Sequence, residues 1–263
     1  MRKQMLSLIG TRGLTLLLLA VLSYGCAAVP VQKDAEPPAK YPVSEIVKDD
    51  VTYPIDAYDP WEGMNRRIYK FNAIFDNYVF LPVVSAYEFI TPDPVEDMVS
   101  NFFNNLHEVT TLINSLLQFK GGKSGLTLSR MLVNTTVGIG GLFDVATKVD
   151  VPKQNEDFGQ TLGLYGMGPG PYIVLPVFGP STLRDSGGLA VDMVTYSLLL
   201  HALIEELDMD HPEEDILKWG LTVLDAIDTR HQQKFRYYAT GSPFEYDLIR
   251  MLYLEKRILD IEN

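Results

Sequence analysis

The chain has 263 residues, of which 46% are hydrophobic, and it carries a formal net charge of −12 at pH 7. This acidity excludes nucleic acid as a partner, because phosphate groups demand a basic protein surface. The same charge argues against docking through a polybasic patch onto anionic lipid head groups.

The N-terminus predicts a secretory signal peptide over residues 1–25. Arg2 and Lys3 precede the apolar run Leu14–Leu22, and small residues follow that run. A positive start, a short apolar segment and small residues before a cleavage point are typical of such a peptide. The run is too short to span a bilayer, which takes roughly 20 residues in a helix.

The only cysteine of the chain, Cys26, stands directly after Gly25, where cleavage would occur. This arrangement resembles the lipobox of bacterial lipoproteins, in which the cysteine is acylated and becomes the mature N-terminus. Ser23 departs from that pattern, which usually has leucine at this place. Ala27 replaces the aspartate that retains such proteins at the inner membrane, so the resemblance predicts a lipid anchor on the outer membrane of a Gram-negative bacterium, facing the periplasm. A free or buried thiol is the alternative.

Residues 26–58 predict a lipidated N-terminus followed by a flexible, proline-rich tether. The segment is polar, prolines interrupt it repeatedly, and nothing in it repeats at a helical or strand period. Residues 59–263 are then long enough to form one domain with its own core.

Three predicted helix starts share a capping residue, a proline directly after it and a glutamate three residues after it. They read DPWE from Asp59, DPVE from Asp93 and SPFE from Ser242. The cap oxygen accepts a free backbone N–H, the proline loses no hydrogen bond there, and the glutamate completes a capping box. Two further helices are predicted at about 183–207 and 212–238, so the fold class is mainly α.

Apolar residues follow these starts at helical spacing. In the first helix, over 61–78, the stripe is Trp61, Met64, Ile68, Phe71, Phe75 and Tyr78. In the second helix the stripe runs from Val95 to Leu116, and Gly121-Gly122 ends the helix. A stripe of this kind faces the core in most soluble domains. The alternative, favoured by the lipid anchor upstream, is a helix lying flat in a lipid interface.

Two segments in the middle of the chain, 133–149 and 158–180, combine many glycines and prolines with many apolar residues. This density prevents long regular structure and leaves room for one short β-hairpin. A solvated linker would not be so apolar, so the backbone here must pack while its polar groups find partners.

Between residues 58 and 190 the chain carries four ordered motifs: DPWEGMNRRIYKFN, SNFFNNL, VNTTVGIGGLFDVA and FGQTLGLYGMGPGPYIVLPVFGPSTLRDSGG. Together they resemble the MlaA (VacJ) family of outer-membrane lipoproteins, and long motifs in order are more specific than short ones. The resemblance implies a ring-like bundle of amphipathic helices in the inner leaflet of the outer membrane, bound to trimeric porins. It also implies retrograde transport, in which mislocalised phospholipids pass from the outer leaflet toward a soluble periplasmic carrier of the MlaC type.

A head group that crosses hydrocarbon unaided meets a barrier of many kcal/mol. A protein path with polar walls for the head and an apolar side for the tails removes that barrier without an energy source. We expect the glycine-rich segments to line or gate such a path, because glycine lets backbone approach the lipid. The candidate residues are Val137, Gly138, Ile139, Gly140, Gly141, Leu142, Phe143, Gly166, Gly168 and Gly170. The alternative is that these glycines only permit tight turns.

The stretch TLRDSGG, Thr182–Gly188, is similar to the GDSGG run that presents the nucleophilic serine of trypsin-like proteases. Arg184 replaces the first glycine, and no histidine of the chain stands at a spacing that places it beside Ser186. A helix start capped by Ser181 or Thr182 fits the mostly helical context better.

Two other motifs carry little chemistry. GGKSG at 121–125 lacks the earlier glycine of a phosphate loop, and no strand precedes it. The acidic run 205–215 could hold a cation, but it lacks the calcium-loop pattern, and a solvated helix junction is the alternative. We therefore predict no enzyme activity, no metal site and no cofactor. The alternative functions are a structural envelope spacer and a lipid hydrolase that uses Ser186.

Overall fold

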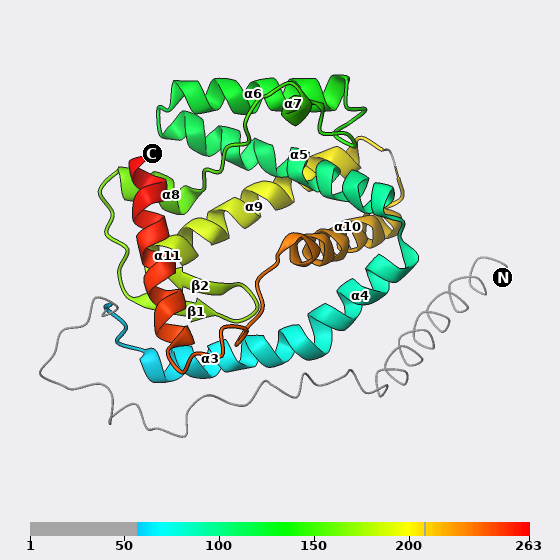
Figure 1. The fold of residues 1–263 in the computed structure, drawn as a ribbon. Coiled ribbons are helices and arrows are strands. Elements are labelled where there is room, and N and C mark those ends of the chain that lie inside the picture. Colours follow the sequence, from blue (N-terminus) through cyan, green and yellow to red (C-terminus); the bar gives the residue numbers. More distant parts are fainter. Residues whose placement is uncertain (1–56, 208) are drawn as a thin grey trace, which may run out of the picture.

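The computed structural model describes residues 57–207 and 209–263 of the chain. The predicted signal peptide, Cys26 and nearly all of the predicted tether lie outside the described residues. Helices dominate the described part and are arranged as a ring-like frame (Figure 1), which confirms the predicted mainly α class.

One long helical rod forms the lower edge of the frame in Figure 1. It consists of α3 (Glu62–Phe75), a π-helical turn η1 (Asp76–Phe80) and α4 (Leu81–Ile90). The predicted first helix, 61–78, therefore extends further than expected. The extension is possible because Pro82 lies in the first turn of α4, where the missing N–H of proline matters least.

A helical hairpin forms the opposite edge of the frame (Figure 1). It pairs α5 (Asp93–Leu117) with α6 (Gly121–Thr136), and the short helix α7 (Val145–Lys148) follows. The prediction that Gly121-Gly122 ends a helix agrees with the end of α5. The same two glycines also begin α6, which the sequence analysis did not predict.

The glycine-rich middle contains the short helix α8 (Phe158–Leu164) and one β-hairpin. Strand β1 (Tyr172–Leu175) pairs antiparallel with β2 (Gly179–Thr182), so that the first residue of β1 lies opposite the last residue of β2. Between them the backbone turns through Val177 at φ 71°, a left-handed conformation that is strained for a β-branched residue. The hairpin confirms the prediction made for this segment.

Two asparagines of α3 hold the free edge of β1. Asn65 donates to the Tyr172 carbonyl (3.0 Å) and accepts from the Val174 N–H (2.9 Å). Asn72 makes the same pair of bonds at the far end of β1. It donates to the Leu175 carbonyl (2.9 Å) and accepts from the Val177 N–H (2.8 Å). Each side-chain amide thus replaces a neighbouring peptide group, which explains how polar residues can be buried in α3.

The last three helices complete the frame. They are α9 (Leu183–Glu205), which crosses its interior, α10 (His211–Gln232), and α11 (Glu245–Glu262), which closes the side between α3 and α8 (Figure 1). Thr182 caps α9 by accepting from the Asp185 N–H at 3.1 Å, which confirms the predicted helix start. The helix predicted over 212–238 is shorter, since α10 ends at Gln232.

The buried apolar cluster is small and lies where α3, β1 and α11 meet. It consists of Tyr69, Tyr172, Val174 and Tyr246. Tyr69 contacts Tyr246 edge to face, with ring centroids 5.8 Å apart, and its hydroxyl donates to Glu245 at 2.8 Å. The cluster ties the first and last described helices together.

The predicted capping boxes at Asp59, Asp93 and Ser242 are wrong in detail. Helix α11 begins at Glu245, behind Phe244 and without a side-chain cap. Helix α3 begins at Glu62, and the Asp59 carboxylate instead accepts from Asn65 (2.7 Å), the Tyr246 hydroxyl and Arg250 (3.1 Å). Helix α5 begins at Asp93 itself, behind Pro92 and without a side-chain cap. The Asp59 carboxylate does not cap α3 because it accepts hydrogen bonds from side chains of α3 and α11 instead.

Polar residues outnumber apolar ones in the interior. Among the described residues, 27 polar or charged residues are buried, against 12 hydrophobic ones. The predicted core-facing stripe of the first helix lies largely outside: Phe71 is 47% exposed and Tyr78 is 73% exposed. The core-facing prediction is therefore wrong for these residues, and the polar side of the helix faces inward.

Two helical segments are long and apolar enough to cross a membrane, by length and composition alone. They are Glu62–Ile90 and Leu183–Glu205, and only 17% of each apolar window is buried. Burial inside a core therefore does not account for their apolar character. An exterior this apolar marks a surface that meets lipid or another protein.

Candidate functional site

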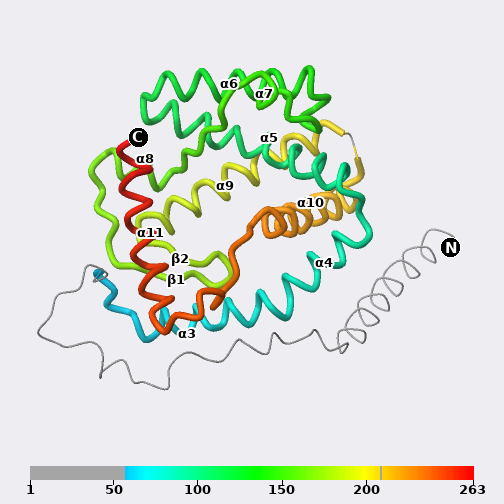
Figure 2. Tube along the Cα trace, viewed as in Figure 1, coloured from blue at the N-terminus to red at the C-terminus, as the bar shows by residue number. Residues whose placement is uncertain are grey.

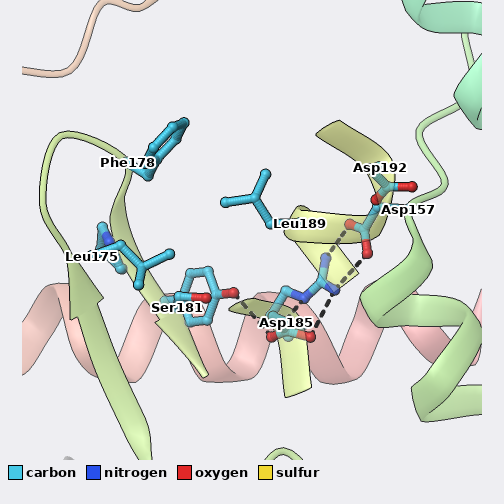
Figure 3. A pocket seen from close by; sticks show the side chains of 10 residues that line it. Asp157, Leu175, Phe178, Ser181, Asp185, Leu189 and Asp192 are labelled. Carbon is cyan, nitrogen blue, oxygen red and sulfur yellow. Dashed lines mark hydrogen bonds and ion pairs between the residues drawn. The ribbon is translucent and has the colours of Figure 1, made fainter. Parts of the chain in front are cut away.

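A pocket of about 240 Å³ lies between the β-hairpin and helices α8, α9 and α11. Figure 3 shows its lining, which is acidic at one end and apolar at the other. The lining residues are Asp157, Leu175, Phe178, Pro180, Ser181, Asp185, Leu189, Asp192, Tyr253 and Arg257. Such a mixture of surfaces suits an amphiphilic ligand.

Arg257 is the centre of the charged wall. Its guanidinium donates to both Asp157 oxygens, at 2.6 and 2.8 Å, and to Asp185 at 3.0 Å. Burial opposes the charge of Arg257, but the two aspartates outweigh it and raise the pKa. Burial likewise opposes the charge of Asp185, but Arg257, Thr182 and Arg184 outweigh it and lower the pKa. The charges of Arg257 and Asp185 therefore persist at neutral pH.

Local backbone geometry brings these side chains together. Asp157 caps α8 by accepting from the Gln160 N–H at 2.8 Å, while Asp185 lies in the first turn of α9. Both positions suit carboxylates, because helix N-termini carry partial positive charge. A Cβ atom at Gly188 would collide with the backbone of Gly159, so only glycine allows α8 and α9 to approach this closely.

Asp192 differs from the other two aspartates because its hydrogen-bond donors are neutral. One oxygen accepts from the Asn114 side chain and the other from the Phe158 N–H, both at 2.9 Å. Burial raises the pKa of Asp192 in spite of these two bonds. Its charge is therefore less well compensated than that of Asp157 or Asp185.

The apolar wall faces this charged group. Leu175 and Phe178 come from the β-hairpin, and Leu189 comes from α9 (Figure 3). Phe178 is 59% exposed, so the wall continues onto the outer surface. The arrangement can shelter a polar group inside while an apolar chain leaves along Phe178.

The ten predicted path residues lie elsewhere. Residues 137–143 form the turn between α6 and α7, and Gly166, Gly168 and Gly170 lie in the loop between α8 and β1. The two segments lie on opposite sides of the frame (Figure 2), and neither lines the pocket. A path or gate at these residues stays a prediction.

The conformations of these glycines differ. A Cβ atom at Gly138 would collide with the carbonyls of Phe143 and Asn134, so this glycine serves close packing. Gly140 has φ +68° but open space around it, whereas Gly168 has open space without a left-handed backbone. Tight-turn and path roles are thus both compatible with these positions, which leaves the two alternatives open.

Ser186 lies within the first turns of α9, and its hydroxyl donates to Ser181 Oγ at 2.9 Å. Three histidine rings lie beside carboxylates elsewhere: His107 contacts Asp225 at 3.2 Å, His231 contacts Glu88 at 2.9 Å, and His211 contacts Glu214 at 3.8 Å. The described contacts of Ser186 thus include neither a base nor an orienting acid.

Within residues 57–207 and 209–263, no three His, Cys, Asp or Glu side chains are grouped to hold a metal ion. Sequence reasoning missed the pocket residues Asp157, Asp192 and Arg257. One signal was available: Asp192 is the only acidic residue between Ser186 and Ile204, in an otherwise mostly apolar helix. An isolated acid in such a helix is costly and indicates a function.

The chain matches the family model described as MlaA lipoprotein over residues 57–259. An "Intermembrane phospholipid transport system lipoprotein MlaA" of Escherichia coli (strain K12) is 37% identical over 182 residues, covering 66% of each chain. The protein of that name from Haemophilus influenzae is 35% identical over 138 residues, covering 51% of this chain and 55% of that one. An uncharacterized protein of Rickettsia prowazekii is 37% identical over 174 residues, covering 66% of each chain.

A solved structure described as "Structural basis for maintenance of bacterial outer membrane lipid asymmetry" is also similar. It matches with a TM-score of 0.59 and 31% identity, covering 78% of this chain and 100% of that chain. The chain spans 66% or less of the length of the three curated relatives above. Since the family model nevertheless covers most of the sequence, including every helix and strand named above except the last three residues of α11, the chain belongs to the MlaA lipoprotein family.

Proposed function

We propose that this protein lies in the inner leaflet of an outer membrane and passes misplaced phospholipids from the outer leaflet toward a soluble periplasmic lipid carrier. The observation that supports this function is the reversed distribution of residues, with a polar interior inside an apolar exterior. An apolar surface is stable against acyl chains, and polar side chains facing inward suit helices that lie along a leaflet. The relatives named for intermembrane phospholipid transport agree with this assignment.

The proposed transport is passive. A head group that leaves water for hydrocarbon loses its hydration, which opposes spontaneous crossing. The pocket offers charged groups for the head and an apolar wall for the start of the tails, so the barrier falls without an energy source. The protein lowers the barrier, and the lipid gradient sets the direction.

Three further elements of the proposal come from family membership. Acylation of Cys26 would hold the chain on the membrane, because each buried methylene contributes about 0.8 kcal/mol. A trimeric porin would position the frame in the leaflet. A soluble periplasmic carrier of the MlaC type would receive the lipid.

The function is tested in a strain that lacks the gene. A membrane-impermeant amine reagent labels phosphatidylethanolamine at the cell surface, and mass spectrometry measures the labelled fraction. We expect the labelled fraction to rise in this strain and to return to normal with the wild-type gene. An equal labelled fraction in both strains would contradict the proposed function.

The same assay separates the alternatives. Ser186→Ala should restore the normal labelled fraction, since the Ser186 hydroxyl donates its hydrogen bond to the hydroxyl of Ser181. Failure of Ser186→Ala at a normal protein level would favour a hydrolase. A spacer would tolerate replacement of loop 166–170 by a polar linker, whereas a transporter that uses this loop would not.

The predicted gate is tested at Gly168. Leucine there meets open space and needs no left-handed backbone, so Gly168→Leu adds bulk without a clash. Gly125→Leu is the matched control, because Gly125 lies in α6 and also has open space around it. More surface phospholipid with Gly168→Leu alone would support the gate, and normal labelling with both would remove it.

A further inference from the structure

The volume of the pocket limits which part of a phospholipid can fit inside it. Its volume is about 240 Å³, whereas pockets that enclose small molecules measure about 300–1,000 Å³. A head group therefore fits inside, and two acyl chains do not. The chains would have to leave past Phe178, whose ring is more than half exposed.

The charge of the pocket selects the kind of head group. Three carboxylates line it, those of Asp157, Asp185 and Asp192, against one guanidinium, that of Arg257. Arg184 donates to Asp185 at 2.9 Å, which adds a second guanidinium beside the pocket. One negative charge still remains in excess, so a cation is attracted and a purely anionic head group is repelled.

The excess negative charge of the pocket can be assigned to the Asp192 side chain. Arg257 is engaged by Asp157 and Asp185, whereas Asp192 receives hydrogen bonds from neutral donors only. A carboxylate oxygen has two lone pairs, so each Asp192 oxygen can accept one more hydrogen bond. A primary ammonium carries three N–H donors in a compact group, which matches a carboxylate of this kind.

We infer that this pocket is a head-group site selective for phospholipids that carry a primary ammonium, such as phosphatidylethanolamine, and that Asp192 binds the ammonium. The inference rests on the proposed function and adds its substrate class. The apolar wall of Leu175, Phe178 and Leu189 receives the glycerol and the first methylenes of the chains. Phosphatidylglycerol, which lacks the ammonium, gains nothing from Asp192.

The experiment uses the full-length protein, purified in detergent and exposed to vesicles of phosphatidylethanolamine and phosphatidylglycerol in equal amounts. The protein is recovered, and mass spectrometry measures the ratio of the two lipids bound to it. A charge-assisted hydrogen bond contributes enough for a preference of about tenfold or more. We therefore expect wild type to enrich phosphatidylethanolamine at least tenfold, and Asp192→Asn to lose about tenfold of that enrichment.

Two variants serve as controls. Asp192→Glu keeps the charge and should keep most of the preference. Asp97→Asn removes an equal charge from the exposed surface of α5 and should leave the ratio unchanged. Phosphatidylethanolamine acetylated on its nitrogen tests the ammonium without any substitution, and wild type should bind it no better than phosphatidylglycerol.

The outcomes separate the inference from the proposed function. Wild type that retains both lipids in the vesicle ratio overturns the inference but leaves lipid transport intact. Wild type that retains no phospholipid contradicts the proposed function as well. Should Asp192→Asn fail to fold, as judged by its thermal unfolding, the acetylated lipid and Asp192→Glu still decide the result.

Discussion

Arg130 is a buried charged residue that links several segments of the polar interior through its hydrogen bonds. Its side chain is 4% exposed, and it donates to Glu108 at 2.7 Å, to Asp144 at 3.1 Å and to the Val151 carbonyl at 2.6 Å. One guanidinium thus joins α5, α6 and the segment around α7. Buried charges of this kind persist only when they are fully paired.

We expect Arg130→Met to destabilise the fold strongly. Removal of one partner of a buried pair leaves the other charge uncompensated, which costs about 3–5 kcal/mol. Thermal unfolding in detergent, followed by circular dichroism, measures the effect. The double variant Arg130→Met with Glu108→Met should recover part of the loss, because it leaves one buried carboxylate fewer. Equal losses for the single and double variants would contradict this account.

Asp144 makes stability depend on pH. Burial opposes its charge, but hydrogen bonds from Thr147 and Asn134 and the charge of Arg130 outweigh burial and lower the pKa to about 2. An unfolded aspartate has a pKa of about 3.9. The ionised form is thus favoured by folding, so its contribution is complete above about pH 4 and is lost as the pH falls through about 2.

The measurement compares thermal midpoints of wild type and Asp144→Asn from pH 6 to pH 2. We expect the gap between them to be constant above about pH 4 and to close as the pH approaches 2. A gap that does not change over this range would show that the charge of Asp144 contributes nothing.

At the scale of elements, helix starts and spacing were predictable, but the direction in which each helix faces was not. The sequence predicts the helices that became α5, α9 and α11, because periodicity and helix-start residues are local signals, although only the predicted cap of α9 forms. Helix α6 was missed because its glycines resemble a terminator. Its inner face is polar and consists of Ser124, Thr127, Arg130 and Asn134.

The pocket was predictable only in part. The start of α9 was predicted, and Asp185 lies in the first turn of that helix. Its partner Arg257 lies 72 residues away, and Asp157 lies 100 residues from Arg257, so no local pattern connects them. Contacts at this separation depend on how whole helices pack, and a single sequence does not encode that in its spacing.

Asn65 carries a prediction about the β-hairpin. Replacement by alanine leaves the Tyr172 carbonyl and the Val174 N–H without partners, at a cost of about 1–3 kcal/mol for each buried group. We expect Asn65→Ala to lower the thermal midpoint clearly. Asn104→Ala should change it little, because both hydrogen bonds of the Asn104 side chain, to Gln232 at 3.4 Å and from Lys153 at 2.8 Å, are exposed to solvent. Equal midpoints for both variants would show that the strand edge does not need Asn65.

At the scale of the whole molecule, the frame has the opposite distribution of polar and apolar residues from that of a typical soluble protein. Apolar side chains cover its outer surface, and charged pairs link its helices from within. Water would penalise such a surface, whereas acyl chains do not. The outer surface should therefore bind lipid even without the predicted anchor at Cys26.

Ile74 tests this expectation on the rod formed by α3, η1 and α4. The background is a Cys26→Ser chain, which cannot be acylated. Without any further substitution, we expect this protein to float with phospholipid vesicles in a density gradient. Ile74 is 49% exposed, so Ile74→Glu places a charge against acyl chains and should lower the floating fraction at least tenfold. Thr229→Glu adds the same charge at an exposed polar position of α10 and should float normally. Equal flotation of both variants would contradict a lipid-facing rod.

Helix α11 has a consequence for how the chain is made. Arg250 and Tyr246 bind Asp59, and Glu245 binds Tyr69, so the final segment fastens the first one. These partners are 176 to 191 residues apart in the sequence, so the ribosome makes α3 long before it makes α11. The frame therefore closes only after α11 has been synthesised. Until then its apolar rods lack the contacts made by α11, and exposed apolar surface of this kind promotes aggregation.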